Sequence, residues 1–189
     1  MLKSWSPASS LDLKCLTFKT AMLIALASAK RPSSLSLLAV KKGFFESSSS
    51  QVRFQPLGLE KTENPGHSAG SLVFESYADD PRLCPVRYIK QYVKRTRSKR
   101  SSDRLFISLL APHGAVTSTI ARWLQKTISL SGQSGSGGST RSVSSSKAAT
   151  NGASLAAVLA AGDWARASTF FTFYFKPSAL SFQSAVLST

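Results

Sequence analysis

Acidic residues are scarce in this chain, whose 189 residues include 9 aspartates and glutamates against 24 lysines and arginines. The resulting net charge of +15 at pH 7 favours a polyanionic partner, such as nucleic acid or an anionic membrane surface. A two-metal nuclease needs clustered carboxylates, and the few acids here are scattered, so this class is disfavoured. The motifs of phosphate-binding loops, dinucleotide folds, zinc proteases and serine hydrolases are absent as well.

Cysteine, histidine and long apolar runs are also rare. The only two cysteines, Cys15 and Cys84, exclude a disulfide scaffold and offer no zinc-binding spacing. The only two histidines, His67 and His113, leave little material for a metal site. The longest apolar run, residues 21–27, is far shorter than the roughly 20 residues of a membrane span. We therefore expect no membrane span, no secretory signal, no metal, no cofactor and no small-molecule substrate.

The remaining composition, 42% hydrophobic, suffices for one compact domain that is mainly α with a small β-hairpin, an α+β fold. We expect this domain to span residues 1–177, with a low-complexity Gly/Ser insert at about 131–139 and a tail at 178–189. The hairpin strands are expected at Val52–Phe54 and Ser71–Phe74, around a long tip. The expected helices with defined bounds are Leu11–Ala29, Pro85–Thr96, Arg141–Thr150, Leu155–Ala161 and Thr169–Phe175. A further helix is expected to begin after Thr117 or Ser118 as its cap and to carry an apolar face that reaches Ile128. The other expected caps are Ser10 or Asp12 for the first helix, Ser154 for Leu155–Ala161 and Ser168 for Thr169–Phe175.

Positive charge is concentrated in the middle of the chain. From Arg82 to Arg104 there are nine basic residues and one acid, so this stretch carries +8 of the net charge. Val86, Ile89 and Val93 form the expected inward stripe of the helix, and the basic residues lie largely outside it. Two interpretations stay open: a solvated helix face followed by a basic loop, or direct contact with phosphates. The candidates for DNA binding are Arg87, Lys90, Lys94, Arg95, Arg97, Lys99 and Arg100.

Phosphate chemistry without a metal needs a nucleophile, cations around the non-bridging oxygens and a general acid for the leaving oxygen. Arginine suits the second role, because its guanidinium fork matches two phosphate oxygens and stays charged. Tyrosine can be the nucleophile, forming a covalent phosphodiester that conserves the bond energy. Residues of these types occur in the segments KRPSS (30–34), LEKT (59–62), STRS (139–142), AGDW (161–164) and STFFTFY (168–174).

In this order, these segments resemble the catalytic domain of the tyrosine recombinase (phage integrase) family, and more narrowly the recombinases of DIRS-type eukaryotic retroelements. The resemblance covers about residues 2–177. It implies an enzyme that binds double-stranded DNA and breaks and rejoins its strands through a 3′-phosphotyrosyl intermediate, without a cofactor. It further implies DNA recombination and integration of a mobile element, action as a homo-tetramer on DNA, and a location in the nucleus.

The family's pattern implies a role for each matching residue. Arg31 and Arg141 would clamp the scissile phosphate, Lys61 would protonate the departing 5′ oxygen, Trp164 would hydrogen-bond the phosphate, and Tyr174 would attack the phosphorus. Each residue also has a structural interpretation. Arg31 can be a cation at a helix end, Arg141 a charge beside the linker, and Lys61 a solvated turn residue. Trp164 and Tyr174 can be aromatic side chains that pack in the core.

The sequence departs from the family's pattern at Gly138, where the family usually has a histidine three residues before the second arginine. Glycine neither accepts nor donates a side-chain proton, so a contribution worth about 10²–10⁴-fold in rate is missing. This departure favours an alternative, a catalytically impaired DNA-binding remnant of a retroelement recombinase.

A second departure is at the start of the chain, because we find no counterpart of the family's N-terminal helical domain, which completes the clamp around DNA. We therefore expect weakened DNA affinity. A third hypothesis, from another class, is a basic interaction protein with no nucleic-acid role. Type IB topoisomerases share the chemistry, but the segments resemble them less.

Overall fold

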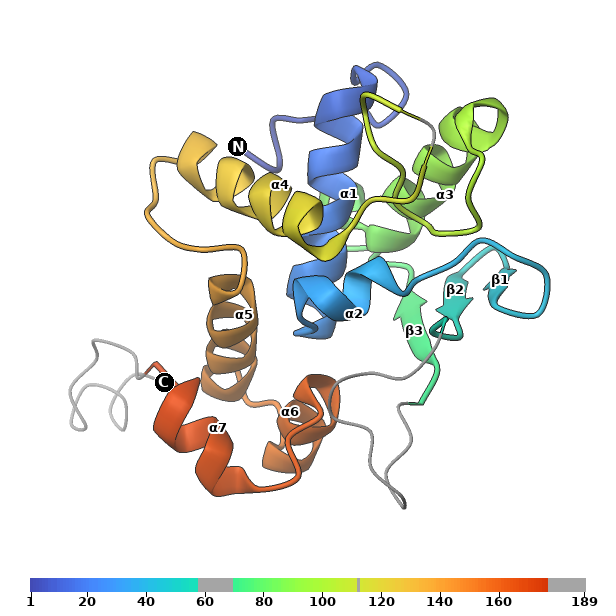
Figure 1. Cartoon of the computed structure of the whole chain (residues 1–189). Coiled ribbons are helices and arrows are strands. Elements are labelled where there is room, and N and C mark those ends of the chain that lie inside the picture. The colour runs from blue at the N-terminus through green and yellow to red at the C-terminus, as the bar shows by residue number, and fades with distance from the viewer. Residues whose placement is uncertain (58–69, 112, 177–189) are drawn as a thin grey trace.

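One long buried helix organises the fold (Figure 1). The computed structural model describes three parts of the chain, residues 1–57, 70–111 and 113–176. Helix α1 (Leu13–Ser28) is buried at every residue from 16 to 25. Asp12 caps it, because its carboxylate accepts a hydrogen bond from the Cys15 backbone N–H at 2.8 Å, and this bond lowers the pKa of the carboxyl group. The expected helix Leu11–Ala29 is thus confirmed with slightly shorter bounds.

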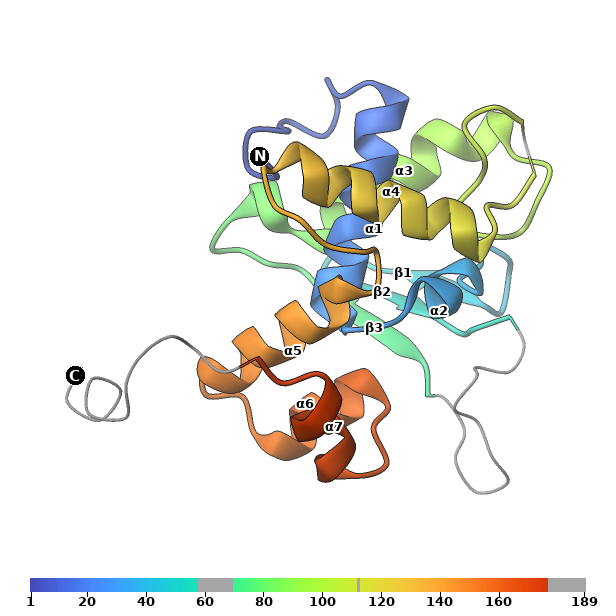
Figure 2. The ribbon, with the colours of Figure 1, turned by 60° about the vertical axis from the view of Figure 1, so that its left-hand side comes forward.

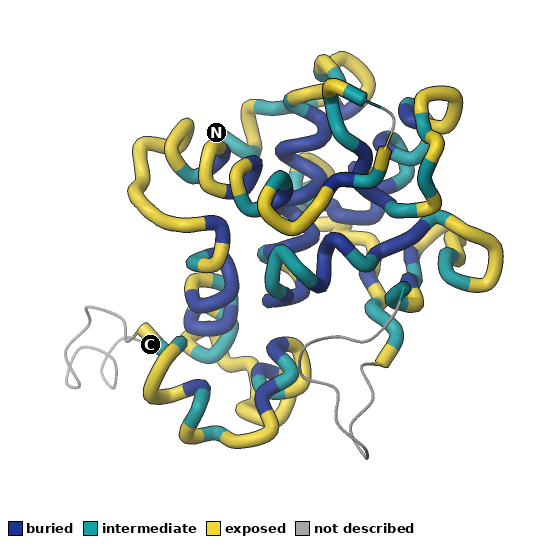
Figure 3. Tube along the Cα trace, in the orientation of Figure 1, coloured by how far each residue is buried: buried dark blue, intermediate teal, exposed yellow. Residues whose placement is uncertain are grey.

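Four other helices pack against α1. They are α2 (Pro32–Ser36), α3 (Pro85–Thr96), α4 (Thr117–Leu130) and α5 (Ser139–Thr150). Two short 3-10 turns flank α3, η1 (Pro81–Leu83) and η2 (Arg97–Lys99). Figures 2 and 3 show α1 at the centre of these elements, with buried residues along most of its length. A helix that is apolar on all sides is stable only when it is covered on all sides, and these neighbours provide that cover.

A small antiparallel sheet completes this part of the molecule. Its strands, in the spatial order β1-β2-β3, are β1 (Phe45–Ser47), β2 (Gln51–Phe54) and β3 (Leu72–Glu75). Val52 pairs with Phe74, and both are buried together with Phe54, so one face of the sheet packs on the helices. The expected hairpin is confirmed in its two strands. Its expected tip, which includes Lys61, lies outside the described residues.

Strand β1 was not expected from the sequence. The serine tract at 47–50 suggests a low-complexity break, whereas the structure uses it as the turn between β1 and β2. The Ser48 backbone N–H donates to the Gln51 carbonyl at 3.0 Å, and the Gln51 N–H donates back to the Ser48 hydroxyl at 3.1 Å. Serine closes such turns with its side chain, so a serine-rich composition does not exclude a short edge strand.

Helix α3 has the bounds that the sequence predicts, but its inward face differs from the expected one. Val86 and Ile89 are buried as expected, whereas Val93 is only partly buried. Tyr88 and Tyr92 fill the face instead, both with no exposed surface. Each phenol has a polar partner in the core: the Tyr92 hydroxyl accepts from the Ile107 backbone N–H at 3.2 Å, and the Tyr88 hydroxyl donates to a carbonyl at 3.1 Å. Such bonds are what allow tyrosine to replace an aliphatic residue in a core.

Two further helices form a separate small core with α5. They are α6 (Leu155–Gly162) and α7 (Ala167–Phe173). Their buried apolar side chains are Val158, Trp164 and Phe170, and they form a cluster of their own. We call α5, α6 and α7 the small lobe, and α1 to α4 with the sheet the large lobe. The small lobe lies at the end of the molecule opposite α3 (Figures 1 and 2).

Two of the four predicted helix caps are correct, namely Asp12 at α1 and Ser154 at α6. The Ser154 hydroxyl caps α6, accepting from the Ala157 N–H at 3.2 Å, as predicted. The predicted cap of α4 by Thr117 or Ser118 is wrong, because both residues lie inside the helix after Val116, which has no capping side chain. The predicted cap of α7 by Ser168 is wrong for the same reason. Helix α7 begins at Ala167 and ends at Phe173, before Tyr174.

Within the described residues, no helix has the length and apolar character needed to cross a membrane. No group of three or more histidine, cysteine or acidic side chains lies within metal-binding reach in the same part of the chain.

Lys19 lies in the middle of α1 with no exposed surface, although it carries a charge. Its ammonium donates to the Leu2 carbonyl at 2.6 Å, to the Trp5 carbonyl and to the Tyr88 hydroxyl at 2.7 Å. The two carbonyls belong to the N-terminal segment, so one side chain fastens that segment to α1 and α3. Burial lowers the pKa of Lys19 to about 8.

The pKa of Lys19 predicts how stability depends on pH. The native protein releases this proton near pH 8, whereas the unfolded chain retains it up to its ordinary pKa of 10.5. The unfolded state therefore binds more protons between these values, and the free energy of unfolding rises by about 1 kcal/mol between pH 7 and pH 9. Denaturant unfolding at both pH values measures the rise. The variant Lys19→Met should show no such rise in the free energy of unfolding. An equal rise in both proteins would contradict the assignment of this effect to Lys19.

Candidate active site

Four of the five residues expected to carry chemistry converge where the two lobes meet. The Arg31 Nη2 lies 3.5 Å from the Tyr174 hydroxyl, across 143 positions of sequence. The Arg141 guanidinium carbon lies 4.2 Å from the centre of the Trp164 ring and 5.1 Å from the centre of the Tyr174 ring. The fifth residue, Lys61, lies outside the described residues. The structure thus brings together the two arginines, the tryptophan and the tyrosine as one cluster.

Arg31 reaches the cluster because the chain reverses after α1. Ala29 ends α1 with a left-handed backbone, at φ 51°. Arg31 then adopts an extended conformation at the start of α2, where Pro32 fixes the first turn. Its side chain is partly exposed, so its guanidinium borders both the tyrosine and solvent.

Arg141 is held rigidly and is 3% exposed. One of its terminal nitrogens donates to the Ala29 carbonyl at 3.2 Å, and the other donates to the Gly162 carbonyl. These carbonyls lie at the C-terminal ends of α1 and α6, where the helix dipole favours a cation. Burial, and then the charge of Arg31, lower the pKa of Arg141 to about 10, so the guanidinium stays charged at neutral pH.

Two buried N–H donors in the cluster lack a partner among the described residues. They are the Nε of Arg141 and the Nε1 of Trp164, on side chains that are 3% and 6% exposed. Buried donors are rarely left without an acceptor. Positively charged surroundings with two unused N–H groups suit an oxyanion, which carries several acceptor oxygens.

Trp164 owes its place to the glycine two residues earlier. A Cβ on Gly162 would lie 2.0 Å from the indole ring, so any larger residue would displace it. The indole packs on Phe170, with ring centres 5.1 Å apart, and on Tyr174, at 4.8 Å. Trp164 therefore does pack in a core, as its structural interpretation supposed, and it also forms one wall of the cluster.

Tyr174 is positioned by contacts with both α7 and α5. It follows the last residue of α7, where its N–H donates to the Phe170 carbonyl at 2.9 Å. Its carbonyl accepts from the Ser146 hydroxyl at 3.2 Å, and the same serine oxygen accepts from the Lys176 N–H at 2.8 Å. The partly buried phenol faces both guanidinium groups. Its hydrogen bond with Arg31 and the charges of Arg31 and Arg141 lower the pKa of Tyr174, against the effect of burial.

Gly138 begins α5, three residues before Arg141, without a capping side chain. A Cβ at this position would meet only the Ser136 hydroxyl, at 3.7 Å. Close packing therefore does not require glycine here. The position that holds a histidine in the resembling family is open to a side chain that this sequence does not supply.

The seven basic residues expected to bind DNA divide into two groups. Three are engaged by the protein: Lys90 donates to the Ser49 carbonyl at 3.0 Å, Arg95 donates to the Leu11 carbonyl, and Arg100 donates to the Arg104 carbonyl at 2.8 Å. The remaining four are exposed, namely Arg87, Lys94, Arg97 and Lys99. The four exposed side chains fit both interpretations, a solvated face with a basic loop and contact with phosphates.

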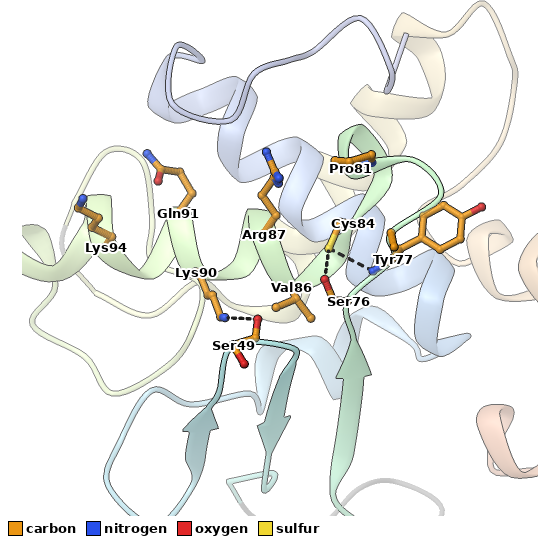
Figure 4. Close-up of a pocket in the computed structure, with 11 residues that line it drawn as sticks. Ser49, Ser76, Tyr77, Pro81, Cys84, Val86, Arg87, Lys90, Gln91 and Lys94 are labelled. Atoms are coloured by element: carbon orange, nitrogen blue, oxygen red, sulfur yellow. Dashed lines mark hydrogen bonds between the residues drawn. The ribbon is translucent and has the colours of Figure 1, made fainter.

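A pocket of about 590 Å³ runs along the exposed face of α3 (Figure 4). Arg87, Lys90 and Lys94 line it from α3, and Ser49 and Tyr77 line it from the sheet side. No acidic residue is among its lining residues, so its charge is positive. The pocket lies along α3, and this helix is at the end of the molecule opposite the small lobe (Figure 1).

The sequence alone assigned no role to Lys30 and Asp163. They form an ion pair beside the cluster, across 133 positions of sequence. The only signal in the sequence is that each directly precedes an assigned residue, Arg31 or Trp164.

Comparison with known proteins places the fold. No protein-family model matches the chain, and no curated protein matches it. Among solved structures, the chain is similar to one titled "Crystal structure of XerA recombinase", with a TM-score of 0.61 and 16% sequence identity. The similarity covers 93% of this chain and 61% of that chain.

The fold is that of a tyrosine recombinase catalytic domain. The expected fold class, mainly α with a small antiparallel sheet, is confirmed. The chain spans 61% of the length of the recombinase chain that it matches. The similarity in sequence is low, so what is shared is the fold, and the roles of the clustered residues stay predictions.

The geometry predicts that Arg31 controls the acidity of the Tyr174 phenol. In Arg31→Gln, the phenol loses its nearest cation, so the pKa of Tyr174 should rise toward its ordinary value of 10. NMR titration of the ¹³C-labelled tyrosine Cζ signals measures this pKa, and Tyr174→Phe assigns the signal. Arg166→Gln is the matched control, because it removes the same charge from an exposed site at the start of α7. An unchanged pKa in Arg31→Gln would contradict the proposed contact.

Proposed function

We propose that this chain is the catalytic domain of a tyrosine recombinase, which binds duplex DNA and cuts and rejoins its strands through Tyr174. The observation that carries the proposal is the convergence of Arg31 and Arg141 on the Tyr174 phenol, beside two buried N–H donors that lack partners. A phosphodiester supplies what the cluster lacks, namely a negative charge, acceptor oxygens and an electrophilic phosphorus.

The proposed reaction is an exchange of phosphodiester bonds. The Tyr174 oxygen attacks the phosphorus and loses its proton to solvent, forming a bond between the phenol oxygen and phosphorus. The bond from phosphorus to the 5′ oxygen breaks, and the departing oxygen takes up a proton, a role that the family resemblance assigns to Lys61. In the reverse direction, the 5′-hydroxyl of another strand attacks the phosphotyrosine and releases the phenol, which completes strand transfer.

The two arginines have different tasks in this reaction. Arg141 is fixed by two carbonyls before DNA arrives, so it stabilises the charge of the transition state without reorganising. Arg31 is partly exposed and makes a long bond of 3.5 Å to Tyr174. It can therefore acidify the phenol and then contact a non-bridging oxygen as the charge moves from the phenol to the phosphate.

The finer assignment rests on the sequence segments alone. We propose that the domain serves integration and recombination of a DIRS-type eukaryotic retroelement, acts in the nucleus, and works as a homo-tetramer on DNA. The support is the order of the five segments from Lys30 to Tyr174.

A trapping experiment tests the reaction. The substrate is a pool of random-sequence duplexes that contain 5′-bridging phosphorothiolate linkages. Cleavage releases a thiol that does not reverse the attack efficiently and needs no general acid, so the covalent protein–DNA adduct accumulates. The adduct should form with the native chain, disappear in Tyr174→Phe and persist in the control Lys41→Met, which alters an exposed side chain of the large lobe outside the cluster and the α3 pocket. Gel electrophoresis under denaturing conditions measures it. An adduct that survives Tyr174→Phe would contradict the assignment.

Gly138 supports a second candidate function, a remnant that binds DNA without cutting it. The same experiment separates the two. Retention of DNA without any adduct, even with the phosphorothiolate, would favour the remnant over the enzyme. Absence of retention at low salt would instead favour a basic interaction protein with no nucleic-acid role.

We further propose that the exposed cations of α3 and η2 contact the DNA backbone. The support is the pocket along α3, which has cationic and no acidic lining residues, and the exposure of Arg87, Lys94, Arg97 and Lys99. Lys90, Arg95 and Arg100 contribute positive charge to this surface while their donors are engaged with backbone carbonyls.

The salt dependence of DNA binding tests this surface. The slope of log K against log salt concentration is negative, and each lost phosphate contact reduces its magnitude by about 0.9. The double variant Arg87→Gln/Lys94→Gln should therefore reduce the magnitude by about 2. Arg82→Gln is the control, because Arg82 is exposed nearby but already paired with Asp80 at 2.9 Å, and its slope should match that of the native chain. Fluorescence anisotropy over a range of salt concentrations measures the slopes. Equal slopes for all three proteins would contradict the proposal.

A further inference from the structure

A buried ion pair links the two lobes at the cluster. The Lys30 ammonium and the Asp163 carboxylate are in contact, and their side chains are 9% and 14% exposed. Lys30 follows α1 in the large lobe, and Asp163 ends α6 in the small lobe. Because a buried charge without a counterion is costly, each of these residues constrains where the other can lie.

The same two turns are joined a second time by Arg141. Its two carbonyl acceptors, Ala29 and Gly162, are the residues directly before Lys30 and Asp163. Two contacts therefore connect the turn at 29–31 with the turn at 162–164. The Arg141 guanidinium binds a backbone carbonyl of each turn, and the Lys30–Asp163 ion pair joins a side chain of each turn. Because the two contacts involve consecutive residues in each turn, together they fix the distance between the turns.

Both turns also have an uncommon backbone. Ala29 and Asp163 are the only non-glycine residues with positive φ in the described parts of the chain, and each has φ 51°. A left-handed backbone costs energy in these residue types, and it persists where surrounding contacts impose it. Each left-handed residue reverses the chain at the end of a helix, which brings Arg31 and Trp164 into the cluster.

We infer that Lys30 and Asp163 are a positioning pair, which holds Arg31 of the large lobe against Tyr174 of the small lobe. The inference rests on the proposed function and deepens it, because it names residues that set the geometry without contacting the DNA. The pair acts through its neighbours, since Lys30 precedes Arg31 and Asp163 precedes Trp164, on which Tyr174 packs.

The pair also sets the charge of the site. Asp163 close to a bound phosphate would repel it, and Lys30 cancels that charge. Arg31 and Arg141 then supply the net positive charge, which suits the additional negative charge of a pentacoordinate phosphorus. Removal of either member of the pair changes both the geometry and this balance.

Three variants separate positioning from simple stability. Asp163→Asn removes the charge and retains both the shape and the tolerance of asparagine for a left-handed backbone. Lys30→Met removes the opposite charge with a similar chain length. The reversal, Lys30→Asp/Asp163→Lys, restores an ion pair. The control is Lys41→Met, which breaks a pair with Asp103 that spans 3.5 Å with side chains more than half exposed.

The readout that decides is the pKa of Tyr174, measured by the ¹³C titration with Arg31→Gln as the reference. Asp163→Asn and Lys30→Met should each shift this pKa toward the value in Arg31→Gln, the reversal should return it toward the native value, and Lys41→Met should leave it unchanged. With DNA, the single variants should slow adduct formation about 10- to 100-fold, while the affinity for DNA changes less than about twofold.

The inference is overturned by a native Tyr174 pKa in a folded Asp163→Asn or Lys30→Met. Should the single variants fail to fold, the reversal decides alone: a native pKa supports the inference, and a raised pKa or an unfolded protein overturns it. The titration needs no catalytic activity. If the native chain forms no adduct, the proposed function fails, while the positioning role is still judged by the pKa.

Discussion

The geometry of the molecule depends on one buried guanidinium. Arg141 donates to the last carbonyls of two helices that belong to different lobes, and it packs against two aromatic rings at the same time. The small lobe has only three fully buried apolar residues in its core, so hydrophobic burial alone gives it little stability. Its attachment to the large lobe combines the packing of α5 on α1 with the polar contacts of Arg141, and these directional contacts fix an orientation that apolar packing would leave less defined.

The Arg141 guanidinium, which lies between the two lobes, both stabilises their contact and supplies positive charge to the cluster. A charge that is buried must be satisfied, and the backbone carbonyls at helix ends satisfy it without adding a carboxylate that would neutralise it. Among the described residues, the Asp163 carboxylate lies beside the cluster, and it is paired with Lys30. The cluster therefore retains positive charge in a place where a folded protein would ordinarily remove it.

The sequence predicts the helical framework well, because its signals are local. Proline at the first position and a strongly amphipathic pattern define Pro85–Thr96, and Ser154 marks the start of α6. Local signals fail where side chains serve tertiary contacts. Thr117 looks like a cap, but its hydroxyl lies 3.2 Å from that of Ser36 in another helix. Strand β1 is hidden because its turn consists of serines, which are equally common in irregular loops.

The candidate site was predicted in part, and only through the resemblance. Composition and periodicity do not connect Arg31 with Tyr174, and the order of short segments does so because it is typical of one family. Lys30 and Asp163 could not be found in this way. An ion pair between distant turns leaves no periodic signal, and its members become visible only when the backbone brings two helix ends together.

The attachment of Tyr174 has a mechanical consequence. The residue is the first after α7, and Ser146 of α5 holds the chain that follows it, through the Tyr174 carbonyl and the Lys176 N–H. A displacement of the phenol would therefore act on α5, the helix that also carries Arg141, as well as on α7. Under the proposed function, a DNA strand linked to this oxygen would therefore displace the phenol and the Arg141 guanidinium together and would not separate them.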